Sequence, residues 1–138
     1  MFERIKSLFA AKPPVEFRHP EFGVLTLDSG LWSGEAQRGG RSVRFCVGGT
    51  DTGPDAGLLD RLRDVLGRFG ELERTALEFI CAQVPTAELA QFTFDSLDFL
   101  WEDKPDDFVY AFTLDSDVDG IWRVVFEGGR PKSLGRED

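Results

Sequence analysis

The sequence predicts an α+β fold in which an antiparallel sheet of about six to seven strands packs against one long or kinked helix. Three short runs of alternating apolar and polar residues precede a helical region, and three to four such runs follow it. Alternation with a period of two is typical of half-buried strands, and spacing by three and four is typical of an amphipathic helix. A length of 138 residues suits a single domain.

The first three strands are expected at residues 22–27, 31–36 and 42–47. Between the second and the third, Gly39 and Gly40 predict a tight hairpin, because glycine adopts the positive φ that such loops need. We therefore expect an antiparallel meander before the helical region.

The helical region is expected from residue 55 to residue 84. One apolar stripe should face the sheet, and it consists of Leu58, Leu62, Val65, Phe69, Leu72, Ala76 and Phe79. Gly67 and Gly70 interrupt it, and each costs a helix about 1 kcal/mol. A kink or break near 67–70 follows.

The remaining strands are expected at 97–101, 108–114 and 121–127, with a short last strand near 132–135. These segments are rich in aromatic and β-branched residues, which suit a pleated, half-buried surface.

Residues 1–14 are expected to form an N-terminal amphipathic segment and linker, and residues 15–138 the single α+β domain. A short N-terminal helix is predicted by the helical spacing of Phe2, Ile5, Leu8 and Phe9. The sequence leaves open whether this helix docks on the domain, frays or touches a membrane.

The net charge of −9 argues against nucleic acid, because binding a duplex requires clustered Lys and Arg residues. No apolar run is long enough to span a membrane. Cys46 and Cys81 each lie in an apolar element and are expected to be buried free thiols, as suits a cytoplasmic protein. The partner is expected to be another protein with a basic surface, and a homodimer is compatible with the sequence.

Most of the charge is concentrated in residues 95–119, where nine acids accompany one base, Lys104. Loops 102–107 and 115–120 should lie at opposite ends of strand 108–114, so one site cannot gather all the acids. The expected interaction surface consists of Asp95, Asp98, Asp115, Asp117 and Asp119.

Asp115, Asp117 and Asp119 begin a segment that looks like a calcium-binding EF-hand loop, and they are the candidate metal ligands. That loop needs a bidentate Glu at its twelfth position, where Phe126 stands. A strand-like segment follows where a helix would be needed. The sequence therefore favours a hairpin that turns at Asp119 and Gly120, with no metal or other cofactor.

No catalytic constellation accompanies the acids. His19 is the single histidine, and no nucleophile elbow is present. The glycine-rich residues 47–54 lack the phosphate-loop patterns, and Asp51 and Asp55 would repel phosphate. An enzyme is not favoured.

Three segments together resemble small bacterial α+β protein families of unknown function. They are residues 19–23 (HPEFG), 32–34 (WSG) and 121–129 (IWRVVFEGG). Several similar families include immunity proteins, which neutralise toxins by binding them. The resemblance implies protein binding and carries no catalytic residue over to this chain.

The sequence favours a non-enzymatic, protein-binding module of the bacterial cytoplasm, possessing an immunity-like layout. The alternative is a small-ligand-binding protein or a carboxylate-based enzyme with a pocket between sheet and helix, using acids such as Asp95, Asp98 and Asp115. A carboxylate that titrates near neutral pH inside a cleft would favour the alternative. A flat acidic or aromatic patch would favour protein binding.

Overall fold

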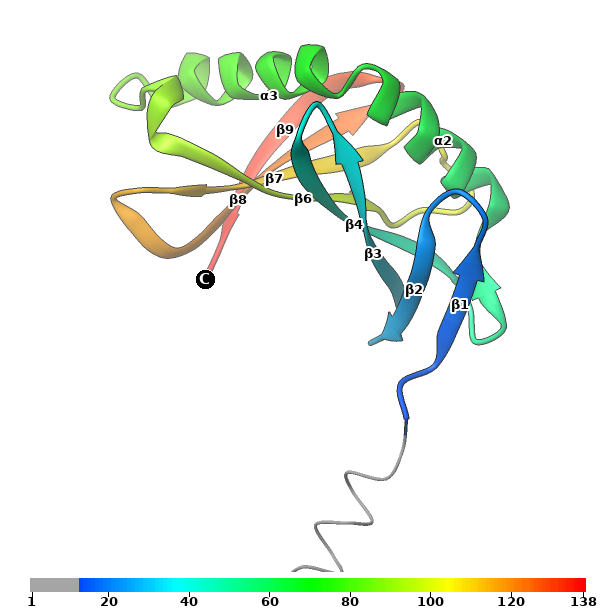
Figure 1. The fold of residues 1–138 in the computed structure, drawn as a ribbon. Helices are drawn as coiled ribbons and strands as arrows, with labels where there is room; N and C mark the ends of the chain where they lie inside the picture. Colours follow the sequence, from blue (N-terminus) through cyan, green and yellow to red (C-terminus); the bar gives the residue numbers. More distant parts are fainter. Residues whose placement is uncertain (1–12) are drawn as a thin grey trace, which may run out of the picture.

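The computed structural model describes residues 13–138, so the predicted N-terminal helix lies outside the described residues. Nine strands form one mixed sheet, and two α-helices of the described chain cover one face of it (Figure 1). Strands make up about 51% of the fold and helices about 24%, so the fold is mostly sheet. The predicted fold class, an antiparallel sheet of six to seven strands on one helix, is therefore wrong.

Along the chain, one meander of strands precedes the two helices and a second meander follows them. The first contains β1 (Glu16–His19), β2 (Gly23–Asp28), β3 (Leu31–Arg38), β4 (Arg41–Thr50) and the two-residue β5 (Gly53–Pro54). The second contains β6 (Phe92–Phe99), β7 (Phe108–Leu114), β8 (Asp117–Glu127) and β9 (Arg130–Glu137). The β3–β4 hairpin turns at Gly39 and Gly40 with φ values of 56° and 79°, as predicted.

The two meanders join through a parallel pair, β4 and β6, in which Phe45, Cys46 and Val47 lie opposite Leu97, Asp98 and Phe99. All the other strand pairs within residues 13–138 are antiparallel. The cause is the connection: α2 and α3 carry the chain back across the sheet, so that β6 runs in the same direction as β4. Parallel neighbours need such a crossover, whereas antiparallel neighbours can be joined by a hairpin.

The helical layer consists of α2 (Ala56–Gly67) and α3 (Phe69–Gln83), with Arg68 between them. The break lies where Gly67 and Gly70 predict it, but it separates two helices rather than kinking one. Asp55 begins α2, because its side chain accepts a hydrogen bond of 3.0 Å from the backbone N–H of Leu58. A short 3-10 turn, Leu89–Gln91, leads into β6.

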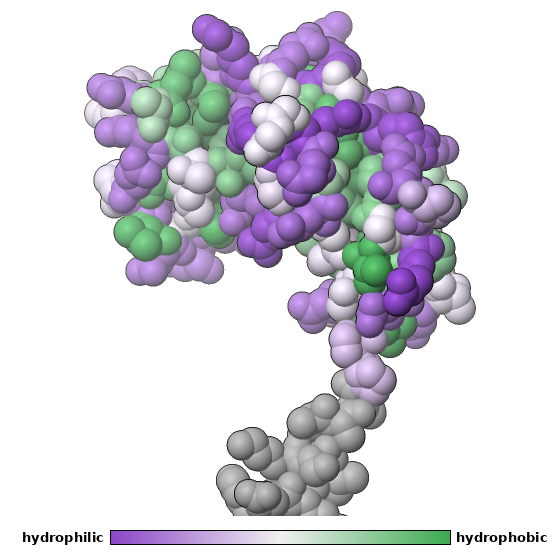
Figure 2. Space-filling view, in the orientation of Figure 1, coloured by the Kyte–Doolittle hydropathy of each residue, from purple (hydrophilic) through white to green (hydrophobic). Residues whose placement is uncertain are grey.

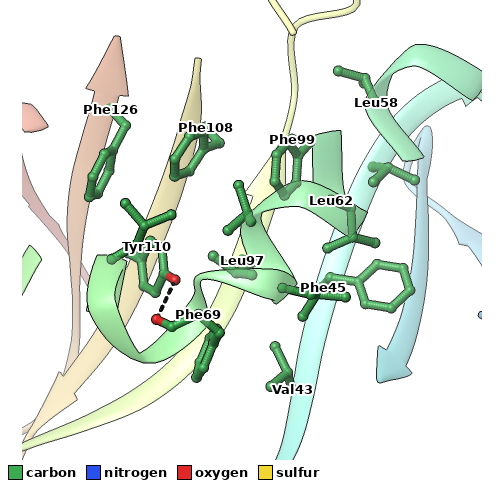
Figure 3. Close-up of a cluster of buried hydrophobic side chains, with 14 of the residues drawn as sticks. Val43, Phe45, Leu58, Leu62, Phe69, Leu97, Phe99, Phe108, Tyr110 and Phe126 are labelled. Atoms are coloured by element: carbon green, nitrogen blue, oxygen red, sulfur yellow. Dashed lines mark hydrogen bonds between the residues drawn. The ribbon is translucent and has the colours of Figure 1, made fainter. Parts of the chain in front are cut away.

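The core lies between the helices and one sheet face (Figure 3). Six of the seven residues in the predicted stripe are buried, and Phe79 is half-buried while Ile80 takes the interior position. Phe45, Leu97, Tyr110 and Val124 form one row across four neighbouring strands of the sheet. All four are at most 1% exposed, so the two meanders share one core.

The β7–β8 hairpin differs from the prediction in where it turns. The turn residues are Asp115 and Ser116, and β8 already begins at Asp117. Leu114 lies opposite Asp117, and Thr113 lies opposite Ile121, so the intervening residues form an irregularity within the ladder. The predicted turn at Asp119 and Gly120 is therefore wrong.

The surface in the view of Figure 2 is mostly hydrophilic, with small separate apolar areas. Within residues 13–138, neither helix has the length and apolar character needed to cross a membrane. Cys46 and Cys81 are unbonded thiols, as predicted, but both are half-buried rather than buried.

Candidate functional site

The carboxyl ends of the parallel strands β4 and β6 meet at one edge of the sheet. The segment at the end of β4, residues 50–55, therefore lies beside the segment that follows β6, residues 100–107. Open sheets commonly bind their ligands outside the carboxyl ends of parallel strands, where the chain changes direction. This edge is the first candidate site.

Gly48 allows the two segments to approach closely. A Cβ atom at position 48 would lie 2.9 Å from the Oε1 atom of Glu102 and 3.6 Å from the carbonyl oxygen of Leu100. Any larger side chain would displace the Glu102 carboxylate. Gly48, within the glycine-rich residues 47–54, therefore leaves room for an acidic side chain against β4.

A shallow hollow of about 570 Å³ lies between the two segments. Its lining residues are Gly49, Thr50, Thr52, Gly53, Pro54, Asp55, Ala56 and Glu102. The hydroxyl groups of Thr50 and Thr52 are 2.8 Å apart and hydrogen-bonded to each other. The charged groups of the lining, Asp55 and Glu102, are both acidic, so the hollow suits a cation rather than an anion.

We call the acids of these two segments the acidic end. They are Asp51, Asp55, Glu102, Asp103, Asp106 and Asp107, and Lys104 is the one base among them. Arg61 of α2 pairs with Asp106 at 2.7 Å. Within residues 13–138, Asp51, Glu102 and Asp103 enter no ion pair, and all three are exposed.

The surface expected at five Asp residues is divided in the structure. Asp98 lies in the middle of its strand and is 6% exposed. Asp115 and Asp119 are exposed, but they follow the carboxyl end of β7, whereas the acidic end lies at its amino end. Asp95 is half-buried at an irregularity in β6. Asp117 accepts hydrogen bonds from Arg136 and from the indole N–H of Trp122.

The candidate metal ligands Asp115, Asp117 and Asp119 do not converge. No group of three or more His, Cys, Asp or Glu side chains in the described part of the chain is arranged to hold a metal ion. The Arg136 guanidinium holds the pKa of Asp117 below its usual value. Asp117 thus has a structural partner in the position where a cation would have to bind.

A second polar group lies on the sheet face opposite the helices. Arg123 of β8 donates a hydrogen bond of 3.2 Å to the Oδ2 atom of Asp98 on β6. The Nε atom of Arg123 lies 3.2 Å from the carboxylate of Glu137, but at an angle that leaves it without a hydrogen bond. Burial raises the pKa of Asp98, and the nearby Arg123 opposes that shift.

The thiol of Cys46 belongs to the same face, opposite Asp98 in the β4–β6 register. Its sulfur is 3.4 Å from the hydroxyl oxygen of Ser33. Burial raises the pKa of Cys46, so the thiol is held in its protonated form. A catalytic cysteine needs a lowered pKa instead.

His19, the one histidine of the sequence, accepts backbone hydrogen bonds from Glu21 and Phe22 in a turn.

A pocket between sheet and helices is present where the helical layer breaks. It has a volume of about 270 Å³ and is lined by Arg61, Asp64, Val65, Arg68, Leu72, Asp106, Phe108, Gly128 and Gly129. Asp95, Asp98 and Asp115, the acids considered for an enzyme, are not among its lining residues. Asp106 belongs to both the pocket and the acidic end.

The sequence reasoning treated loop 102–107 alone and missed that residues 50–55 lie next to it. The signal that could have found this is the strand–helix–strand order, which favours parallel neighbours with adjacent carboxyl ends. Comparison of the chain with protein-family models, curated proteins and solved structures finds no match. The likeness to immunity proteins therefore stays a prediction.

Proposed function

We propose that the domain is a non-enzymatic binding module that recognises a basic surface of another protein through its acidic end. The observation that carries the proposal is that two chain segments, which together carry six acids and Lys104 as their one base, lie side by side at one edge of the sheet. Complementary charge accelerates encounter and excludes wrong partners.

Glu102 and Asp103 are the acids we assign to first contact with the partner. Both are exposed and, among the residues that the structure describes, both lack an ion pair. A partner cation can therefore bind them without breaking an existing pair. Partial burial raises the pKa of the Cys46 thiol, which argues against a catalytic role for it and agrees with a binding function.

We place this activity in the cytoplasm of a bacterial cell. Two free thiols suit a reducing compartment. Toxin neutralisation by an immunity-like protein is one process of this kind, since it needs a tight protein complex and no chemistry.

The test is affinity capture with the immobilised domain in an extract of the source cells, followed by mass spectrometry. The wild type should retain a basic protein at low salt and release it at high salt, because salt screens exposed charges. The double variant Glu102→Gln/Asp103→Asn should lose that protein.

The matched control is Asp115→Asn/Asp119→Asn, which also removes two exposed carboxylates but at the far end of β7. It should retain the partner. Equal retention by both double variants would contradict the proposal, because net charge alone, or another surface, would then account for binding.

A further inference from the structure

The pocket at the break between α2 and α3 has an apolar floor. Val65, Leu72 and Phe108 line it, and their side chains are at most 5% exposed. They come from α2, α3 and β7, three elements that the shared core holds in place (Figure 1). The floor is therefore preformed and needs no rearrangement to accept an apolar group.

The rim of the pocket carries two guanidinium groups. Arg61 is held by Asp106 at 2.7 Å and by Asp64 at 3.1 Å. Arg68 is held by Glu71 at 3.1 Å and remains largely exposed. Each guanidinium has a carboxylate partner, so the rim offers flat cationic surfaces without a net positive charge.

This combination selects an aromatic ring. A guanidinium stacks favourably on an aromatic face, and an apolar cavity of about 150 Å³ already holds benzene. The pocket of about 270 Å³ has room for a larger ring such as an indole. A bare anion would meet Asp64 and Asp106 on the same rim.

The pocket adjoins the acidic end through Asp106, which lines the pocket and lies in the same loop as Glu102 and Asp103. A ligand that fills the pocket therefore extends naturally over exposed carboxylates. Binding hot spots have this arrangement, with a buried aromatic anchor inside a polar ring.

We propose that the pocket between α2, α3 and the β8–β9 turn receives an aromatic side chain flanked by basic residues in the partner. This inference rests on the proposed function and adds to it the anchor that the partner must carry. The acidic end then attracts the partner, and the pocket gives the complex its specificity.

The test uses two capped peptides, Ac-Lys-Arg-Trp-Arg-Lys-NH2 and the same peptide with Ala in place of Trp, titrated into the full chain. Methyl NMR signals of Val65 and Leu72 report on the pocket, and the titration gives each affinity. The Trp peptide should bind about tenfold or more tightly, because burying an aromatic side chain is worth at least that factor. It alone should shift the two methyl signals.

Arg68→Gln removes one stacking surface and should reduce the preference for the Trp peptide several-fold. Arg74→Gln is the control, because Arg74 also pairs with a single Glu but does not line the pocket. It should leave both affinities unchanged.

Equal, salt-sensitive binding of both peptides would overturn the anchor while leaving the proposed function standing. Tighter Trp binding without methyl shifts at Val65 and Leu72 would also overturn it, because the ring would then bind elsewhere. Failure of both peptides to bind at low salt would contradict the acidic end and the anchor together.

Discussion

The guanidinium of Arg123 crosses over strand β7 to reach the carboxylate of Asp98, with Nη1 and Oδ2 3.2 Å apart. Ala111 lies opposite Arg123 on β7, and Val109 lies opposite Asp98. These two residues are only 1% and 2% exposed, although they belong to the face without helices. The small side chain of Ala111 leaves room for the arginine, and the ion pair in turn covers β7, which lies between β6 and β8.

The first prediction concerns Asp98→Asn. Burial raises the pKa of Asp98 in the folded protein. The protonated Asp98 therefore stabilises the folded protein at pH values below the ordinary carboxyl pKa, and this contribution is lost as the pH rises through the raised pKa. Asn cannot ionise, so the free energy of unfolding of the variant should improve relative to the wild type between pH 3 and pH 7.

Urea denaturation at a series of pH values measures this difference. Asp95→Asn is the control, because Asp95 lies on the same strand but is less buried. The stability gained by Asp98→Asn over the wild type should grow as the pH rises. If it stays constant or falls instead, the attraction of Arg123 for the Asp98 carboxylate outweighs the cost of burying it.

The second prediction concerns Tyr110→Phe. The phenol of Tyr110 donates a buried hydrogen bond of 2.9 Å to the carbonyl oxygen of Phe69, the first residue of α3 (Figure 3). Phenylalanine keeps the ring and removes this bond, so the variant should lose about 1 kcal/mol of unfolding free energy. Guanidinium denaturation measures the loss, and an unchanged midpoint would show that the bond does not stabilise α3 on the sheet.

The third prediction concerns Phe69→Ala. The Phe69 ring is 6% exposed, meets the Phe94 ring edge-on at 4.9 Å between centroids, and lies beneath the guanidinium of Arg41 at 5.1 Å. Emptying this site should cost about 3–5 kcal/mol of unfolding free energy. Phe79→Ala, at a half-buried position of the same helix, should cost clearly less. A loss of under about 1 kcal/mol for Phe69→Ala is the scale of surface changes and would contradict its core role.

The fourth prediction concerns calcium. Asp117 is held by Arg136 at 2.7 Å and by Trp122 at 3.1 Å, so a cation would have to displace both. Millimolar calcium should leave Tm unchanged, because only a ligand that binds the folded state raises it. Titration calorimetry on metal-free protein checks this. Micromolar binding that Asp117→Ala abolishes would restore the metal site.

The sequence predicts local features of the fold well. The hairpin at Gly39 and Gly40 and the helix break at Arg68 follow from backbone conformations that a few neighbouring residues determine. The buried stripe from Leu58 to Ala76 follows from helical periodicity.

Strand order is where sequence reasoning fails. Alternation shows that residues 42–47 and the β6 region are strands, but it does not record which strands are neighbours. The parallel register of Phe45 with Leu97 depends on the route of the helical connection. The acidic end could not be predicted for the same reason, because Glu102 approaches Gly48 only when β4 and β6 are neighbours. The predicted surface position of Asp98 is wrong for the same reason, because the side chain is buried against Arg123, which the strand order brings from β8, two strands away.

The parallel pair of β4 and β6 also has a consequence for folding kinetics. Each hairpin of the two meanders joins strands that are consecutive in the chain, so its closure entropy is small. Pairing of Phe45 with Leu97 instead closes a loop that contains both helices. Contacts between residues so far apart in the sequence slow folding. We therefore expect docking of one meander on the other along β4 and β6 to carry most of the entropic barrier. Substitutions at this β4–β6 contact should then change the folding rate more than substitutions at either edge strand.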